Sequence, residues 1–167
     1  MPEERKGQPR EGYVIEHPNR EKAASKATKA IVVLLLLVTA ALMIIISVGG
    51  WDALEGAKAL QIAYIVLDLC MAFLVARWNR GVLPVAAALA IVMLIFALIA
   101  GPQWFERDKE GFAQPGLDAS VLGLVTLLLV PVQALLVLAA MSGFRQAWNV
   151  EVERRPEPPP RAAPQPG

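Results

Sequence analysis

The chain has 167 residues, of which 56% are hydrophobic and only 19% are charged, and its formal net charge is +1. Its hydrophobic residues are gathered into long blocks, whereas a soluble domain distributes them along amphipathic elements. The composition therefore excludes an ordinary soluble domain and indicates a protein of the lipid bilayer. No nucleic acid partner is expected for such a chain.

The first 18 residues are rich in proline, glycine and charge, which favours disorder. A helix is predicted to begin near Asn19, a good N-cap residue after Pro18, and to continue through Lys29 into the first apolar block. This basic region is far longer than the n-region of a cleavable signal, so the first block is predicted to be an uncleaved membrane anchor.

Four apolar blocks are long enough to cross a hydrocarbon core of about 30 Å as helices. They cover residues 31–49, 59–76, 82–100 and 119–142. Helices are expected because lipid offers no partner for backbone N–H and C=O groups, and the blocks do not show the alternation typical of a transmembrane β-barrel. The predicted fold class is all-α. It is an integral-membrane four-helix bundle over residues 19–144, with disordered cytoplasmic tails at residues 1–18 and 145–167.

The distribution of lysine and arginine predicts the orientation of the bundle. Of the 16 lysine and arginine residues, seven precede the first span, two lie between the second and third spans, and four follow the last span. Thirteen cations thus fall on one side of the membrane and three on the other, and the cation-rich side is normally cytoplasmic. Both termini are therefore predicted to lie in the cytoplasm, with the protein in the cell (plasma) membrane.

One tryptophan follows each predicted span. Tryptophan prefers the headgroup region, where both its apolar ring and its polar N–H are accommodated. We expect these residues to anchor the spans at the two membrane interfaces: Trp51, Trp78, Trp104 and Trp148.

Asp68 lies near the middle of the second span, where a carboxylate costs about 2.5 to 3.5 kcal/mol to insert. It is therefore expected to face the interior of the bundle, on the same face as Tyr64 and Gln61 and at a depth close to Thr39 and Gln133. Gln133 is the predicted hydrogen-bond partner and Thr39 the rival. The cluster has two interpretations: a structural hydrogen bond between helices, which is preferred because nothing else resembles a proton relay, or a proton-coupling carboxylate.

The third span carries small residues on one helical face, which lets a neighbouring helix approach closely. This stripe consists of Ala86, Ala90, Ala97 and Gly101. In the fourth span, Pro131 removes one backbone hydrogen bond, so a kink is predicted that frees a carbonyl near Leu127.

Two segments outside the spans have distinctive compositions. The loop of residues 101–118 alternates charges beside aromatic residues, which is typical of a short amphipathic helix on a membrane surface. The proline-rich tail from residue 154 onward cannot bury a core and is predicted to be an extended, partly polyproline II segment.

The sequence offers no nucleotide-binding loop, no metal-ligand cluster and no nucleophile with a base. His17 is the only histidine, and Cys70 is the only cysteine, which excludes an internal disulfide and quinone-linked thiol oxidation. No catalytic residue, metal or cofactor is therefore predicted. The expected function is that of a non-enzymatic accessory or scaffolding subunit, with the lipid bilayer and other membrane subunits, or a second copy, as partners. The alternative is a small oligomeric transporter or proton-coupled carrier that uses Asp68.

Overall fold

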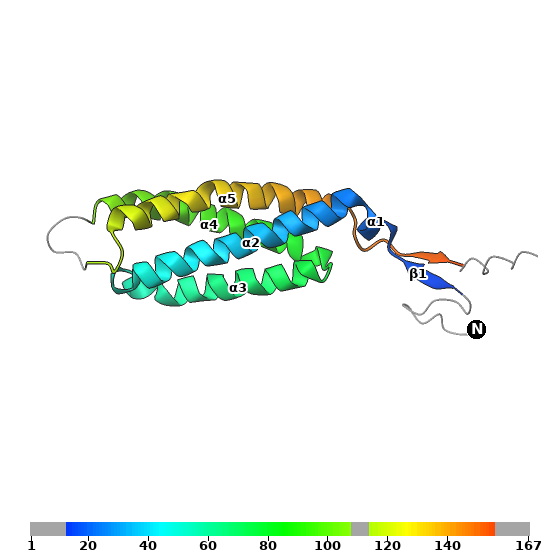
Figure 1. Cartoon of the computed structure of the whole chain (residues 1–167), viewed down its shortest axis with the longest axis horizontal. Helices are drawn as coiled ribbons and strands as arrows, with labels where there is room; N and C mark the ends of the chain where they lie inside the picture. The colour runs from blue at the N-terminus through cyan, green and yellow to red at the C-terminus, as the bar shows by residue number, and fades with distance from the viewer. Residues whose placement is uncertain (1–12, 108–113, 156–167) are drawn as a thin grey trace, which may run out of the picture.

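The computed structural model describes residues 13–107 and 114–155, and within them most of the chain is helical (Figure 1). The α-helices there are α1 (Pro18–Glu21), α2 (Ala23–Gly49), α3 (Lys58–Ala76), α4 (Leu83–Phe105) and α5 (Ala119–Arg145). Short 3-10 turns are η1 (Trp51–Ala53), η2 (Glu55–Ala57) and η3 (Arg80–Val82), and the strands are β1 (Val14–Glu16) and β2 (Val152–Arg154). The prediction of a helical bundle is confirmed, with a small two-stranded ribbon added to it.

The four long helices, α2 to α5, are long and apolar enough to cross a membrane, judged by length and composition. They coincide with the four predicted spans, and two of them continue past the predicted ends: α4 runs through Pro102 to Phe105, and α5 continues to Arg145. Helix α2 begins at Ala23, so the helical extension predicted ahead of the first span is present, although it was predicted to begin near Asn19.

The start of the predicted surface loop is therefore part of α4. Gly101–Phe105 is helical, and Glu106 and Arg107 form the turn that follows. The amphipathic helix predicted for this loop falls mostly in residues 108–113, which lie outside the described residues.

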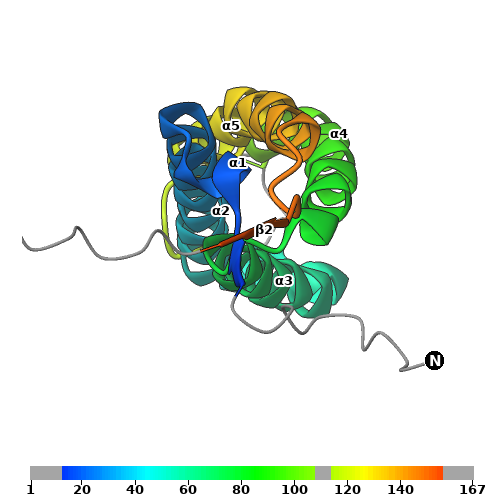
Figure 2. The same cartoon turned by 90° about the vertical axis from the view of Figure 1, so that its right-hand side faces the viewer.

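The four long helices form an antiparallel bundle in which sequence neighbours are not always packing neighbours. Helix α5 packs most extensively on α4 and also on α2, while α3 packs on α2. Helices α3 and α4 are joined by a short turn, yet they scarcely touch each other. Around the bundle axis the packing order is therefore α3, α2, α5 and α4 (Figure 2), and the facing sides of α3 and α4 form what we call the α3–α4 seam.

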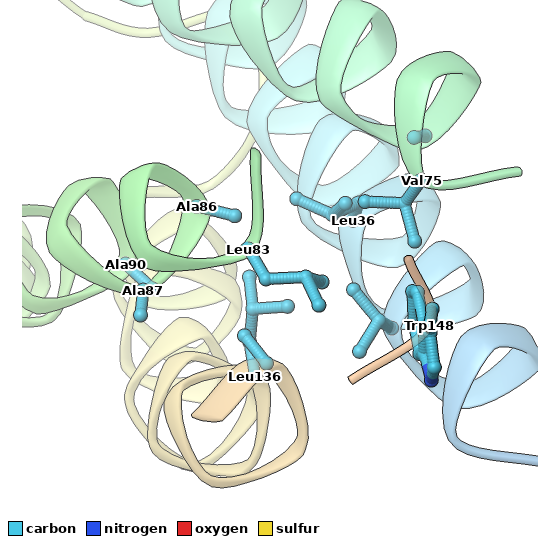
Figure 3. Packing of buried hydrophobic residues seen from close by; sticks show 11 residues of the cluster. Leu36, Val75, Leu83, Ala86, Ala87, Ala90, Leu136 and Trp148 are labelled. Carbon is cyan, nitrogen blue, oxygen red and sulfur yellow. The ribbon is translucent and has the colours of Figure 1, made fainter. Parts of the chain in front are cut away.

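Two apolar clusters make up the core. One lies toward the end of the bundle that carries β1, β2 and η3, which we call the terminal end, and Figure 3 shows Leu36, Leu83 and Leu136 converging there from three helices. The other lies toward the opposite end, the loop end, and includes Met43 and Leu129. A buried polar layer separates the two clusters. It consists of one residue each from α2, α3 and α5, and each lies between the residues that its helix contributes to the two clusters: Thr39, Asp68 and Gln133.

Parts of both tails are ordered at the terminal end, contrary to the expectation of disorder for residues 1–18 and 145–167. Strands β1 and β2 pair antiparallel, with Ile15 opposite Glu153. An ion pair joins them, with Arg154 Nη1 3.5 Å from Glu16 Oε2. The two segments leave the same end of the bundle, so each strand satisfies backbone groups of the other. Helix α1 is capped at His17, with Pro18 in its first turn, whereas Asn19 was predicted as the cap.

Trp148 closes the terminal end from inside. After α5 ends, Ala147 has a φ of 50°, and this turn carries Trp148 back over the end of the bundle, where it is fully buried (Figure 3). Its ring lies edge-on to the ring of Trp78, with their centroids 5.2 Å apart. Arg80 Nε donates to the Phe144 carbonyl at 2.7 Å and Arg20 Nε to the Trp148 carbonyl at 3.0 Å. These hydrogen bonds hold the returning chain in place.

Two of the four predicted interface anchors are therefore placed differently. Trp104 and Trp148 are buried in the bundle, so their rings are not presented to the surroundings. Trp104 belongs to the extension of α4, on its buried face, and Trp148 is folded inward by the turn at Ala147. Trp51 is exposed, and the Lys58 ammonium lies 4.8 Å from the centre of its ring. Trp78 is half-buried, and the Lys29 ammonium lies 4.1 Å from the centre of its ring.

Candidate functional site

The polar layer divides into two parts with different hydrogen bonding. In the first, Gln133 Nε2 of α5 donates to Thr39 Oγ1 of α2 at 2.8 Å, and the Thr39 hydroxyl donates to the Leu35 carbonyl at 2.9 Å. Both side chains are almost completely buried. This pair is a satisfied interhelical hydrogen bond, which is the structural role that buried polar residues of membrane bundles most often have.

Gln61 belongs to a separate contact nearer the loop end. The Ser47 hydroxyl of α2 lies 2.5 Å from Gln61 Oε1 and 2.7 Å from the Met43 carbonyl. Gln61 thus ties α3 to α2, and it does not join Thr39 or Gln133.

Asp68 is the second part of the polar layer. Its residue surface is only 5% exposed, and its Oδ2 atom is buried without a hydrogen-bond partner in the described part of the chain. The prediction that Gln133 or Thr39 pairs with Asp68 is wrong, because these two residues bond to each other. The reason is the packing order: α5 packs mainly on α2 and α4, so the Gln133 amide meets α2 before it can reach α3.

Tyr64 lies one helical turn from Asp68 on the same face of α3. It is 6% exposed, and its hydroxyl makes no hydrogen bond within residues 13–107 and 114–155. A buried tyrosine hydroxyl usually finds a partner. The Oδ2 atom of Asp68 is thus the buried polar atom of this face of α3 that has no partner in the described residues, and Tyr64 lies one turn from it.

A cavity of about 340 Å³ opens at the α3–α4 seam, in the loop-end half of the bundle. Its walls come from all four long helices, and they include Met43, Ile46, Leu60, Tyr64, Met93, Phe96, Trp104, Thr126 and Leu129. Small residues line the same space, among them Ala53, Ala57, Ala97 and Ala100. Their side chains are too short to bring α3 and α4 into contact, which explains why the seam is open here.

Arg107 stands at the edge of this cavity. Its Nη1 donates to the Ala53 carbonyl at 2.8 Å, and its guanidinium lies 4.9 Å from the centre of the Trp104 ring. The sequence analysis did not single out Arg107. The available signal was an arginine three residues after a tryptophan, a spacing that places both on one helical face.

The small-residue stripe of α4 is buried by other helices of the same chain. Ala86, Ala90, Ala97 and Gly101 are all buried, and α4 makes its most extensive contact with α5. At Gly101 an added Cβ would stand 2.5 Å from Leu127 Cδ2, so a larger residue there would require the Leu127 side chain to move. Helix α5 contributes glycines of its own, and Gly123 meets Phe105 in the same way.

The described residues contain no group of three or more His, Cys, Asp or Glu side chains that could hold a metal ion. Cys70 is a free, exposed thiol on α3. Comparison with models of protein families, with curated proteins and with solved structures finds no match to this chain. The site is therefore defined by its own geometry: an open seam, a cavity lined by Tyr64, and the buried Oδ2 atom of Asp68, which has no partner in the described residues.

Proposed function

We propose that this protein is a non-enzymatic integral membrane protein of the plasma membrane that acts as an accessory or scaffolding subunit of a membrane assembly. In this proposal α2, α3, α4 and α5 cross the bilayer and both termini lie in the cytoplasm. The length and hydropathy of the four helices and the excess of lysine and arginine at the terminal end support it.

The observation that carries the proposal is the one-sided packing of α3. Only 22% of its apolar stretch is buried within the chain, against 33 to 39% for the other three. Helices in lipid associate through close packing and polar contacts, because lipid tails are as apolar as leucine. A helix that packs on α2 alone and carries Asp68 leaves its other flank for a partner helix. We infer that a transmembrane helix of another subunit, or of a second copy, covers the exposed face of α3.

Cross-linking from Cys70 tests this contact in the native membrane. The thiol is exposed on α3, on the side of the helix turned away from Asp68, so a photoreactive maleimide attached there samples what covers the exposed face of α3. We expect one discrete protein adduct of constant stoichiometry, and its mass distinguishes a second copy from another subunit. Leu138→Cys in a Cys70→Ser background is the control, because Leu138 is 66% exposed on α5, and we expect it to give little protein adduct. Equal adduct yields at both positions would contradict the proposal.

Reporter fusions test the orientation. An enzyme that is active only outside the cytoplasm should be active when fused after Glu106 and silent when fused after Arg80 or Val150. The reverse pattern would overturn the orientation. Activity after both Arg80 and Glu106 would overturn the arrangement of four spans.

A second candidate function follows from the unpaired Oδ2 atom of Asp68, which a satisfied structural residue does not explain. In this function the protein is a small oligomeric transporter or proton-coupled carrier, with Asp68 as the coupling carboxylate. Asp68→Asn should then fold normally and abolish a pH-dependent uptake. Uptake that keeps its pH dependence in Asp68→Asn would exclude this role.

A further inference from the structure

The cavity at the α3–α4 seam has the character of a small-molecule site. Its volume of about 340 Å³ falls in the range of ligand pockets, and such pockets combine apolar and aromatic walls with a few polar groups. The rings of Tyr64, Phe96 and Trp104 come from two helices that scarcely touch each other. A ligand between them would supply the contacts that α3 and α4 do not make directly.

The polar groups of the cavity indicate what the ligand carries. Tyr64 lines the cavity, and Asp68, which is not itself among the lining residues, lies one turn beyond it on the same face of α3. Both residues are less than one-tenth exposed, and the Oδ2 atom of Asp68 is buried without a hydrogen-bond partner in the described residues. Leaving such an atom unpaired is costly, so a ligand that donates a hydrogen bond to it would be favoured.

The charges around the cavity favour a cation. At the loop end, the described residues of the α2–α3 connection and the turn after α4 contribute three carboxylates, from Asp52, Glu55 and Glu106, against the cations of Lys58 and Arg107. Asp68 adds a further carboxyl in the interior. None of these carboxylates is among the residues that line the cavity, and Arg107 is the one charged residue of the described chain that does. Arg107 lies over Trp104 and donates to the Ala53 carbonyl, and Lys58 lies over Trp51, so each cation already has a contact within the chain. Aromatic rings attract an organic cation through their faces.

We propose that this cavity binds a lipophilic amine, with the apolar body of the ligand between Phe96 and Trp104 and its ammonium group directed past the Tyr64 hydroxyl toward Asp68. The site does not depend on an accessory or a transport function, since binding to the isolated protein is sufficient. Burying an ammonium ion is costly in an apolar site unless a carboxylate pairs with it, which gives Asp68 a role in specificity.

Calorimetric titration of the purified full-length protein in phosphatidylcholine nanodiscs tests the proposal, with empty nanodiscs subtracted. The probes are 4-phenylbutylamine, 4-phenylbutanol and 4-phenylbutanoate, which share one apolar body and differ in the charge of the head group. We expect saturable binding of the amine at one site per chain, at least about ten-fold tighter than the alcohol, and no saturable binding of the carboxylate.

Variants separate binding from simple partitioning. Asp68→Asn should weaken amine binding at least about ten-fold and leave alcohol binding unchanged, and Tyr64→Phe should weaken amine binding several-fold. Glu151→Gln, which removes a carboxylate at the opposite end of the bundle, is the matched control and should bind like the parent. A thermal unfolding transition recorded for each variant shows whether it is folded, and Tyr64→Phe keeps the test valid should Asp68→Asn fail to fold.

Three results would overturn the proposal. Equal heats for amine and alcohol would mean partitioning into an apolar space. Tighter binding of the carboxylate would mean that Arg107 sets the preference and that the ligand is an anionic amphiphile. Undiminished amine binding in both folded variants would place the amine elsewhere.

Discussion

Helix α4 has two neighbours, and it meets them in opposite ways. Toward α5 it presents alanines and a glycine, and the Leu127 side chain packs so closely on Gly101 that a methyl group there would overlap it. Toward α3, to which it is joined by a short turn, it scarcely packs at all, and a cavity of about 340 Å³ lies between them. Small residues therefore produce a tight contact on one side and an open space on the other.

The difference lies in what the facing helix offers. Helix α5 places Leu127 over Gly101 and its own Gly123 under Phe105, so large and small residues alternate across the contact. At the seam, Ala97 and Ala100 of α4 line the cavity together with Ala53 and Ala57 of the α2–α3 connection, and the larger residues around them leave the space between the helices open. Small residues thus permit close packing only where the opposing surface supplies bulk.

The largest effect is expected from adding bulk to the tight contact. Ala90→Leu places three more carbons on the buried face of α4 and should lower the free energy of unfolding in detergent by about 3 kcal/mol, because overpacking forces helices apart. Ala88→Leu, the same change at an exposed position of α4, should cost less than about 0.5 kcal/mol. Ala97→Leu should fall between them, since Ala97 also lines the cavity. Equal costs at all three positions would mean that the contact is not tight.

The next effect has the opposite sign and belongs to the seam. Asp68→Leu should raise the free energy of unfolding of the isolated protein by about 1 to 2 kcal/mol, because it removes a buried oxygen that has no partner. Stabilisation at the expense of ligand or partner binding is typical of a functional site. A loss of stability in Asp68→Leu, measured by the same unfolding titration, would instead identify a structural hydrogen bond at this residue.

A smaller effect is expected for the satisfied pair in the polar layer. A double-mutant cycle with Thr39→Val and Gln133→Leu should give a coupling energy of about 0.6 kcal/mol, the usual size for an interhelical hydrogen bond in a membrane bundle. Repeating the cycle with Asp68→Asn and Gln133→Leu should give no coupling. A larger coupling in the second cycle would restore the pairing expected from depth alone.

The smallest effect concerns the start of α5 and depends on pH. Hydrogen bonds from the Ser120 hydroxyl and backbone N–H lower the pKa of Asp118 below 3.8. Since the pKa is depressed in the folded state, the stabilisation is present above the unfolded-state pKa and is lost as the pH falls through the folded-state pKa. Below about pH 4, the melting temperature of the parent should therefore fall slightly more than that of Asp118→Asn. Parallel profiles would show that this cap does not contribute.

Length and hydropathy were sufficient to predict the four long helices, because a span is specified by the residues of its own segment. The buried stripe at Ala86, Ala90, Ala97 and Gly101 also falls on one face by spacing alone. The partner of Gln133 was not predictable in this way, because depth along a helix does not reveal which helices are neighbours. The sequence predicted that the long Gln133 side chain reaches Asp68, and the packing order assigns it to Thr39.

Local sequence also gave the wrong placement for residues that long-range packing controls. Trp148 follows a span, as an interface anchor does, but a backbone turn at Ala147 buries it. The cavity has no sequence signature, since alanines that leave a gap are indistinguishable from alanines that permit contact. Tyr64 was grouped with Asp68 from its spacing, but its unpaired hydroxyl became apparent only with the cavity in place.

The contrast between the two sides of α4 can be measured directly from distance distributions between spin labels in nanodiscs. In a Cys70→Ser background, Ile95→Cys on α4 is paired either with Val66→Cys on α3 or with Leu128→Cys on α5, three positions of nearly equal exposure. A contact with little buried packing opens more readily, so the α3–α4 distribution should be clearly broader than the α4–α5 distribution and should narrow when 4-phenylbutylamine is added. Equally narrow distributions for both pairs without ligand would contradict the account.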